Sequence, residues 1–193
     1  MKKIPTLFVR KFEGHKIVDV LPQITPGCEE AFLSGEATVK IDGSCCAIIN
    51  GEFYKRYDAK QGKKPPKSAI PCCDPDPITG HWPHWVAVDK YNKGDTWFTV
   101  AYANYVMKNG MPADGTYEAV GPHINANPHN LDQHILIPHG IEKITVKRDY
   151  DSIKKYLEET PIEGIVFWLN GEPVCKIKRS DFGFQWPIKE EKE

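Results

Sequence analysis

The sequence lacks several patterns that would identify a common class of protein. Its 193 residues contain no apolar run that approaches the roughly 18–20 residues of a membrane-spanning helix. The opening stretch MKKIPTLFVRKFEG has neither a long apolar segment nor a small-residue cleavage site, so we expect no signal peptide. No G-x-x-x-x-G-K-[ST] or G-x-G-x-x-G loop is present to cradle phosphate. We therefore expect a cytoplasmic protein that would hold phosphate with side chains instead.

A strong excess of either charge is also missing. The net charge is -1, so the overall charge indicates no nucleic-acid partner. Basic residues nevertheless gather locally, and this cluster could form a basic groove. Its members are Lys55, Arg56, Lys60, Lys63, Lys64 and Lys67. The hydrophobic content of 40% is enough for a core. The length suits one domain or two very small ones, and we expect a single domain covering residues 1–193.

The six cysteines form no C-x-x-C pair. Neighbouring side chains on a strand point to opposite faces, so two adjacent cysteines rarely bind one metal ion. We interpret the cysteines as reduced structural thiols of an intracellular protein, with zinc binding as the less favoured alternative. They are Cys28, Cys45, Cys46, Cys72, Cys73 and Cys175.

Apolar and β-branched runs predict a protein rich in strands. The expected strands are 37–41, 45–50, 53–58, 116–120, 134–137, 163–168 and 173–178, with a hairpin turn at Asn50-Gly51. Capping patterns predict two helices, 96–109 after Asp95 and 150–159 after Asp149. Residues 61–84 contain six prolines and no periodicity, which favours a long loop. The order of the elements indicates an α+β fold with mainly antiparallel sheets.

Charged residues within or beside these strands are the candidates for chemistry. Each alone has an ordinary explanation, because K-x-D-G is typical of a strand that ends in a turn and strand charges protect sheet edges. For the glutamate in YEAV, alternation does not decide between solvent and a site. The two lysines of K-I-K lie two apart, so a strand puts them on one face. The candidates are Lys40, Asp42, Gly43, Arg56, Glu118, Glu163, Lys176 and Lys178.

Taken together, these residues suit a site for a polyphosphate and a metal ion. Lysine and arginine complement the charge of phosphate groups. Carboxylates suit Mg²⁺, which prefers a few hard oxygen ligands and keeps its waters.

The order K-x-D-G, Arg, Glu, E-G-I-V, K-x-K resembles nucleotidyltransferase motifs I, Ia, III, IV and V of the covalent ligase superfamily. That superfamily contains the ATP-dependent DNA and RNA ligases and the mRNA capping enzymes. Five segments are similar to the animal 5′-to-3′ RNA ligase family, across about residues 20–188. They are ATVKIDGSCC, YEAVGPHINANP, HILIPHG, EGIVFW and KIKRSDFGFQWP.

The resemblance implies an ATP-grasp-like adenylylation domain, with antiparallel sheets flanking a nucleotide cleft. It implies that the Lys40 amine attacks ATP, that AMP passes to an RNA 5′-phosphate, and that a 3′-hydroxyl then displaces AMP. ATP would be a substrate and Mg²⁺ the metal, with Mn²⁺ as an alternative. The partners would be ATP and RNA with 5′-phosphate and 3′-hydroxyl ends, with no membrane partner, and the protein would be a monomer.

Each role carries over by motif position. Asp42 would order Lys40 and metal-bound water, and Gly43 would permit the turn. Arg56 would hold a phosphate, and Glu118 would bind the ribose hydroxyls. The roles at the end of the chain are metal binding by Glu163, contact with adenine by Val166, and neutralisation of the α-phosphate by Lys176 and Lys178. Nearby cations lower a lysine pKa, so we expect Lys40 to titrate below its free value.

Two features depart from the family pattern. Val39 precedes the nucleophile where many RNA ligases have an acid. The segment HILIPHG offers only aliphatic residues and His134 or His139 where an aromatic ring usually stacks on adenine. We interpret such a histidine as structural and assign no stacking residue.

Three other functions remain as alternatives. A DNA ligase or capping enzyme is disfavoured, because those enzymes append an OB domain and only 15 residues follow Lys178. The chain could instead bind ATP or adenylylate itself as an RNA-end sensor, without joining strands. Lastly, AMP could be transferred to an acceptor other than RNA.

Overall fold

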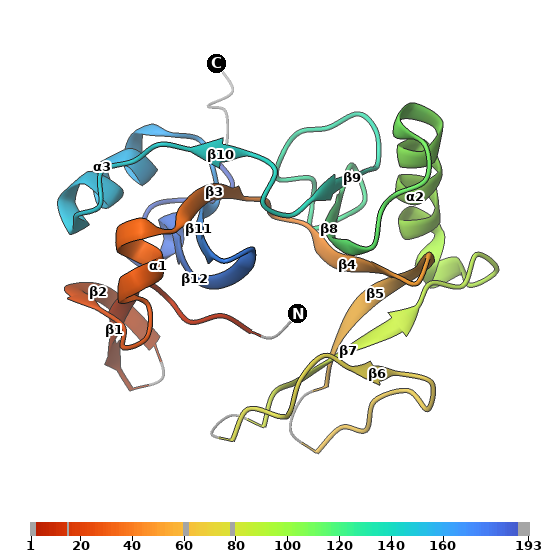
Figure 1. The fold of residues 1–193 in the computed structure, drawn as a ribbon, viewed down its shortest axis with the longest axis horizontal. Coiled ribbons are helices and arrows are strands. Elements are labelled where there is room, and N and C mark those ends of the chain that lie inside the picture. Colours follow the sequence, from red (N-terminus) through yellow and green to blue (C-terminus); the bar gives the residue numbers. More distant parts are fainter. Residues whose placement is uncertain (1–2, 15, 60–61, 78–79, 189–193) are drawn as a thin grey trace. The chain divides into compact units, whose positions relative to one another are not determined.

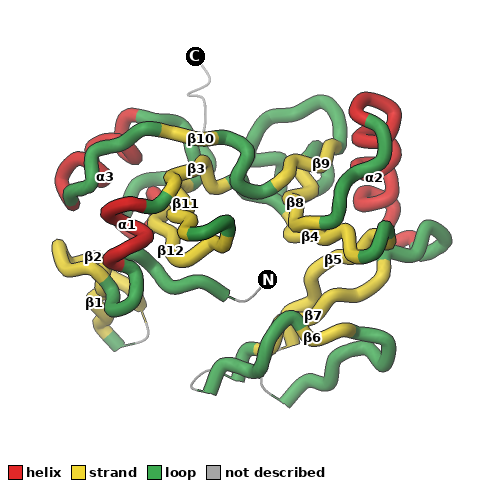
Figure 2. Tube along the Cα trace, viewed as in Figure 1, coloured by secondary structure: helices red, strands yellow, loops and turns green. Residues whose placement is uncertain are grey.

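A computed structural model describes residues 3–14, 16–59, 62–77 and 80–188 (Figure 1). The α+β class with antiparallel sheets is confirmed, and Figure 2 shows strands and loops outweighing helices. The described chain forms two compact units. Unit 1 contains residues 42–139, and unit 2 contains residues 4–41 and 140–188. Each unit is described by itself below.

Unit 1 is built on one six-stranded sheet. Its strands are β4 (Ser44–Ile49), β5 (Glu52–Ala59), β6 (Ile70–Pro71), β7 (Trp82–Ala87), β8 (Gly115–Val120) and β9 (Ile135–Pro138). The spatial order is β6-β7-β5-β4-β8-β9, and every pairing is antiparallel. Asn50 and Gly51 both have positive φ, which the tight turn between β4 and β5 requires.

Helix α2 (Thr96–Asn109) packs on one face of this sheet, after the short helix η1 (Lys93–Asp95). The core between them contains Ala101 from α2, Cys46 from β4 and Tyr117 from β8. The same strands present Cys45 and Glu118 to the other face, because side chains alternate along a strand. Because alternate residues of β4 and β8 pack against α2, the residues between them, including Cys45 and Glu118, lie on the opposite face of the sheet.

Unit 2 contains a four-stranded antiparallel sheet and a two-stranded ribbon. The sheet consists of β3 (Glu36–Lys40), β10 (Lys143–Ile144), β11 (Gly164–Leu169) and β12 (Glu172–Lys178), in the order β10-β3-β11-β12. The ribbon pairs β1 (Phe8–Glu13) with β2 (Lys16–Ile24). The helices are α1 (Glu29–Ser34), α3 (Tyr150–Glu159) and η2 (Arg179–Phe182).

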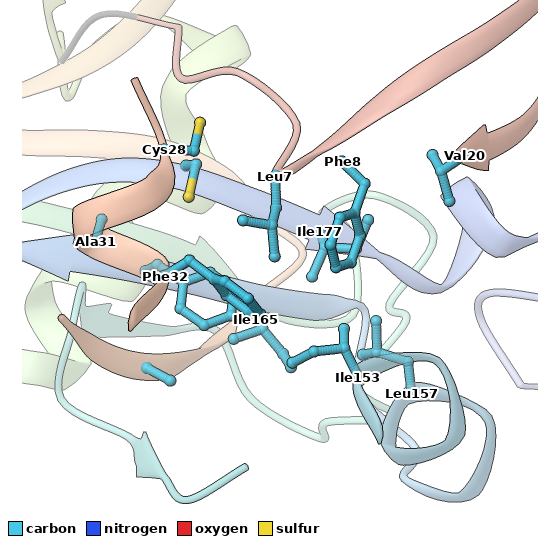
Figure 3. Packing of buried hydrophobic residues seen from close by; sticks show 13 residues of the cluster. Leu7, Phe8, Val20, Cys28, Ala31, Phe32, Ile153, Leu157, Ile165 and Ile177 are labelled. Carbon is cyan, nitrogen blue, oxygen red and sulfur yellow. The ribbon is translucent and has the colours of Figure 1, made fainter. Parts of the chain in front are cut away.

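The core of unit 2 lies against one face of its four-stranded sheet. Figure 3 shows Phe32 of α1 and Ile153 of α3 meeting Ile165 of β11. Ile177 of β12 and Phe167 of β11 are fully buried in the same cluster. Burying one such side chain contributes about 1.5–3 kcal/mol, so this cluster holds the sheet and helices together.

Most expected elements are confirmed near their predicted bounds. The seven expected strands correspond to β3, β4, β5, β8, β9, β11 and β12, and the two expected helices to α2 and α3. The structure adds β1, β2, α1, β6, β7 and β10, which the sequence pattern did not predict. The prediction of an unbroken loop at 61–84 is wrong, because β6 lies within it and β7 begins at Trp82. Residues 61, 78 and 79 lie outside the described residues.

The helix boundaries agree with the sequence, although one cap differs. Asp149 caps α3, since its carboxylate accepts a hydrogen bond from the Ser152 amide at 2.8 Å. Helix α2 begins after Asp95, but that side chain forms no cap and is only 1% exposed. It accepts from the Lys55 ammonium and from the Asp89 amide instead. No helix among the described residues has the length and apolar character needed to cross a membrane.

Candidate active site

In unit 2, strand register gathers the predicted residues on the sheet face opposite the core. Gly164 lies directly opposite both Lys40 on β3 and Lys178 on β12. Val166 lies opposite Lys176, one step further along. Residues that face each other across antiparallel strands point to the same side of the sheet. Lys40, Val166, Lys176 and Lys178 therefore share one face.

Lys40 is held by an ion pair with Glu163. The distance between Lys40 Nζ and Glu163 Oε2 is 2.5 Å, and both side chains are largely buried. Glu163 immediately precedes β11, so the pairing of β3 with β11 brings these residues together. The sequence placed the two residues in separate motifs, and the structure joins them in one contact.

The amine of Lys176 has a lowered pKa. Burial and the neighbouring charges of Lys40 and Lys178 lower the pKa of Lys176 to about 8, while Glu163 raises it in part. A lysine whose pKa is lowered by burial and by neighbouring cations is a candidate for a functional site.

Gly164 is required by the close approach of the strands. A Cβ atom on this residue would lie 2.3 Å from the Ile177 carbonyl oxygen and 2.9 Å from the Lys178 Cα. Any side chain at this position would therefore collide with β12. The glycine of the E-G-I-V motif thus lets β12 lie close beside β11, next to Lys40 and Lys178.

In unit 1, Arg56 and Glu118 share the sheet face opposite α2. Cys45 lies directly opposite Glu118 across β4 and β8. Its neighbour Cys46 pairs with Lys55, so Cys45 and Arg56 occupy the alternate face. Arg56 forms an ion pair with Asp58 at 2.8 Å and also contacts the Cys45 thiol.

Glu118 has a partner that the motifs did not indicate. His139 Nε2 lies 2.7 Å from Glu118 Oε2, and His139 Nδ1 lies 3.0 Å from the Thr116 hydroxyl. Glu118 is only 8% exposed. The segment HILIPHG drew attention to His139, but only as a structural residue. The register of β8 with β9 is what sets it beside the predicted ribose ligand.

Asp42 and Gly43 are held by the loop that follows β8. Asn125 Nδ2 donates to the Asp42 carboxylate at 3.2 Å and to the Gly43 carbonyl at 2.6 Å. His129 Nε2 lies 3.1 Å from the Asp42 amide nitrogen. A Cβ on Gly43 would lie 2.3 Å from the Ala119 carbonyl oxygen, so only glycine fits. The loop in the NANP segment therefore fixes the K-x-D-G turn.

His134, the other histidine of HILIPHG, lies in a stack of flat rings. The indole of Trp97 is parallel to the rings of His123 and His134, with centroid distances of 4.0 and 4.7 Å. His134 is 5% exposed, and burial lowers its pKa. These contacts agree with the structural role that the sequence suggested for His134.

The predicted residues thus form two sets. The set in unit 2 consists of Lys40, Glu163, Val166, Lys176 and Lys178. In unit 1, Arg56 and Glu118 share one face of the sheet, and Asp42 and Gly43 form the turn that precedes β4. Lys40-Ile41-Asp42-Gly43 spans the boundary between the units along the chain.

Two of the predicted residues, one in each unit, are candidate ligands for a metal ion. Glu163 offers carboxylate oxygens beside Lys40, and Asp42 offers a carboxylate in unit 1. Mg²⁺ is commonly bound through one or two carboxylates together with substrate phosphates.

Comparison with known proteins finds similarity to one family, RNA ligase 1. The model of the RNA ligase 1 family matches residues 110–192. This range contains Glu118, Glu163 and Lys176, and Lys40 lies before it.

Individual relatives extend the likeness further. RNA ligase 1 of Pongo abelii is 27% identical, with 97% of this chain and 82% of that protein covered. RNA ligase 1 of Danio rerio is 26% identical over 79% of this chain and 68% of that protein. RNA ligase 1 of Mus musculus is 25% identical, with 97% of this chain and 82% of that protein covered. The chain is therefore similar to animal RNA ligases of the RNA ligase 1 family over most of its length, in agreement with the family that its motifs indicate.

Proposed function

We propose that the chain is an ATP-dependent RNA ligase that forms a phosphoric ester between an RNA 5′-phosphate and a 3′-hydroxyl. One observation carries the proposal. Lys40 lies on the same sheet face as Lys176 and Lys178, with Glu163 2.5 Å from its amine nitrogen. The similarity to RNA ligase 1 proteins supports the class of reaction.

In the first step, the neutral amine of Lys40 attacks the α-phosphorus of ATP. A phosphorus–nitrogen bond forms, the bond to pyrophosphate breaks, and the amine proton passes to solvent. Lys40 must first leave its ion pair with Glu163, because an ammonium group has no electron pair to donate. Lys176 and Lys178 would neutralise the charge that builds on the α-phosphate oxygens.

The remaining roles in unit 2 and unit 1 follow the motif positions. Val166 would contact adenine, Glu118 would bind the ribose hydroxyls, and Arg56 would hold a phosphate. Asp42 and Glu163 would hold Mg²⁺, which when bound supplies positive charge to the phosphate oxygens. The ATP-grasp-like nucleotide cleft is part of this proposal and rests on the family resemblance.

Two further transfers complete the reaction. An oxygen of the RNA 5′-phosphate takes AMP from Lys40, which forms a 5′-5′ pyrophosphate linkage and restores the lysine. A 3′-hydroxyl then attacks that 5′-phosphate, expels AMP and seals the strand. The energy of one ATP bond is thus held first in the bond between Lys40 and AMP and then in the 5′-5′ pyrophosphate linkage, until the strand is joined.

The covalent step is tested by intact mass after incubation with ATP and Mg²⁺. We expect wild type to gain one AMP and Lys40→Ala to gain none. Lys143→Ala is the matched control, because Lys143 lies on the neighbouring strand β10 in an exposed ion pair with Glu36. If wild type gains no AMP and carries none from expression, the mechanism is wrong.

The main alternative is an RNA-end sensor that binds ATP or adenylylates itself without joining strands. Radiolabelled ATP with nicked RNA, nicked DNA and a protein acceptor separates the cases. Sealed RNA supports the ligase, label retained only on Lys40 supports the sensor, and label on another acceptor supports transfer elsewhere.

The exposed lysines Lys63, Lys64 and Lys67 are the proposed contact with the RNA backbone. Phosphate contacts dominate nucleic-acid affinity and make it depend on salt. Charge reversal at all three should weaken RNA binding and flatten its salt dependence. Unchanged binding and salt slope would exclude this surface. Lys60, which belongs to the same basic cluster in sequence, lies outside the described residues.

A further inference from the structure

Unit 1 contains a group of side chains that the proposed reaction uses only in part. One potential ligand atom each from Cys45, Glu118 and His139 lies within 4.8 Å of the others. Cys45 belongs to β4, Glu118 to β8, and His139 directly follows β9. Three adjacent strands thus deliver a sulfur, an oxygen and a nitrogen donor to one place.

Hydrogen bonds already orient two of these donors. The Thr116 hydroxyl lies 3.0 Å from His139 Nδ1, which leaves His139 Nε2 facing the Glu118 carboxylate at 2.7 Å. A partner on the second ring nitrogen is the usual arrangement for a metal-binding histidine. Cys45 lies directly opposite Glu118 in the strand register, so its sulfur points to the same side.

The donor set indicates which class of ion would bind. Cysteine and histidine favour zinc-like transition ions over Mg²⁺, which prefers oxygen alone. Three protein ligands leave the fourth tetrahedral position open.

Binding would require the Cys45 thiol to release its proton to solvent, because the thiolate is the ligand. In the metal-free protein, burial and then the Glu118 charge raise the pKa of Cys45 to about 12. A coordinating metal ion stabilises the thiolate, so the thiol gives up its proton to solvent despite that raised pKa.

We propose that Cys45, Glu118 and His139 form a site for Zn²⁺ or a similar ion, and that this ion prevents ATP binding by occupying Glu118. The binding site stands on the geometry alone. The inhibition rests on the proposed function, in which Glu118 holds the ribose of ATP. The site would make the protein sensitive to free zinc at an atom that its substrate needs.

Binding is tested with Co²⁺ alone as the probe, because a thiolate ligand gives cobalt a strong charge-transfer absorption. We expect wild type to bind one Co²⁺ with this band, and added Zn²⁺ to displace it. Cys45→Ser should lose the band. His139→Gln should weaken binding by more than the roughly 10–100-fold that loss of a ligand's own hydrogen-bond partner causes. The control Cys72→Ser should bind as wild type does, and thermal unfolding should show that each variant is folded.

Inhibition is tested by measuring the AMP adduct with and without one equivalent of Zn²⁺ per protein. Zinc should suppress the adduct in wild type and leave Cys45→Ser at its own metal-free level. A wild type without the cobalt band, or a band that survives Cys45→Ser, overturns the site. A cobalt band with an unaffected adduct overturns the inhibition. An absent adduct without zinc contradicts the proposed function and leaves the metal site standing.

Discussion

The amine nitrogen of Lys40 lies 2.5 Å from the carboxylate of Glu163, although 123 residues separate them in the chain. This contact comes from the pairing of β3 with β11, in which Gly164 lies opposite Lys40. It means that the candidate nucleophile and a candidate metal ligand start as one ion pair. The mechanism must therefore separate them before the amine reacts.

Glu163→Gln should slow formation of the AMP adduct by roughly 10²-fold. The neutral amide of glutamine cannot form an ion pair with Lys40, and it is a poor ligand for Mg²⁺. Single-turnover assays with radiolabelled ATP measure this rate. Glu36→Gln is the matched control, since Glu36 forms an exposed ion pair with Lys143 in the same sheet. Equal rates for Glu163→Gln and wild type would remove Glu163 from the reaction.

The lowered pKa of Lys176 predicts a pH limit for ATP use. Below about pH 8, Lys176 is protonated and can neutralise phosphate, and above that pH it loses its charge. Relative to Lys176→Arg, the value of kcat/KM for ATP in self-adenylylation should therefore fall above about pH 8, since this quantity reports groups of the free enzyme. In Lys176→Arg the fall should move to higher pH, because arginine stays charged. Identical profiles for the two proteins would show that Lys176 is not the titrating group.

Gly164→Ala should destabilise unit 2. The added methyl group would meet the Ile177 carbonyl oxygen at 2.3 Å, so β11 and β12 must move apart. We expect a loss of about 2 kcal/mol in the free energy of unfolding, measured in urea. Gly94→Ala is the control, because its Cβ would meet only the Asn92 side chain at 3.3 Å and should cost under about 1 kcal/mol. Equal stabilities would mean that the strands accommodate the methyl group.

Lys55→Met should destabilise unit 1 without acting on the reaction. Lys55 pairs with Asp95, whose side chain is only 2% exposed, and removing one partner leaves a buried charge. The expected loss is about 3 kcal/mol in the free energy of unfolding. Lys143→Met removes an ion pair whose side chains are 64% and 61% exposed, and should cost under about 1 kcal/mol. A similar small loss for Lys55→Met would show that Asp95 finds another partner.

Much of the fold could be predicted from local patterns. Strands β4, β8, β11 and β12 have strong apolar content, and α3 has a capping aspartate at Asp149. The ribbon of β1 and β2 gave a weaker signal, because it exposes Phe12 and Val18 and contains a proline at position 22. Its place in the protein depends on Phe8 and Val20 packing into the unit 2 core. Helix α1 has only six residues, too few for a clear helical period.

In the candidate site, too, some features follow from the local sequence and others only from the tertiary structure. The sequence alone determined that Lys176 and Lys178 share a face, because strand alternation is a local property. Motif order also identified Lys40, Glu163 and Glu118 as candidates. Only the tertiary structure decided that Lys40 pairs with Glu163 and that His139 contacts Glu118. Those contacts depend on hydrogen-bond register between strands distant in the chain, and register is set by the packing of whole sheets on their cores.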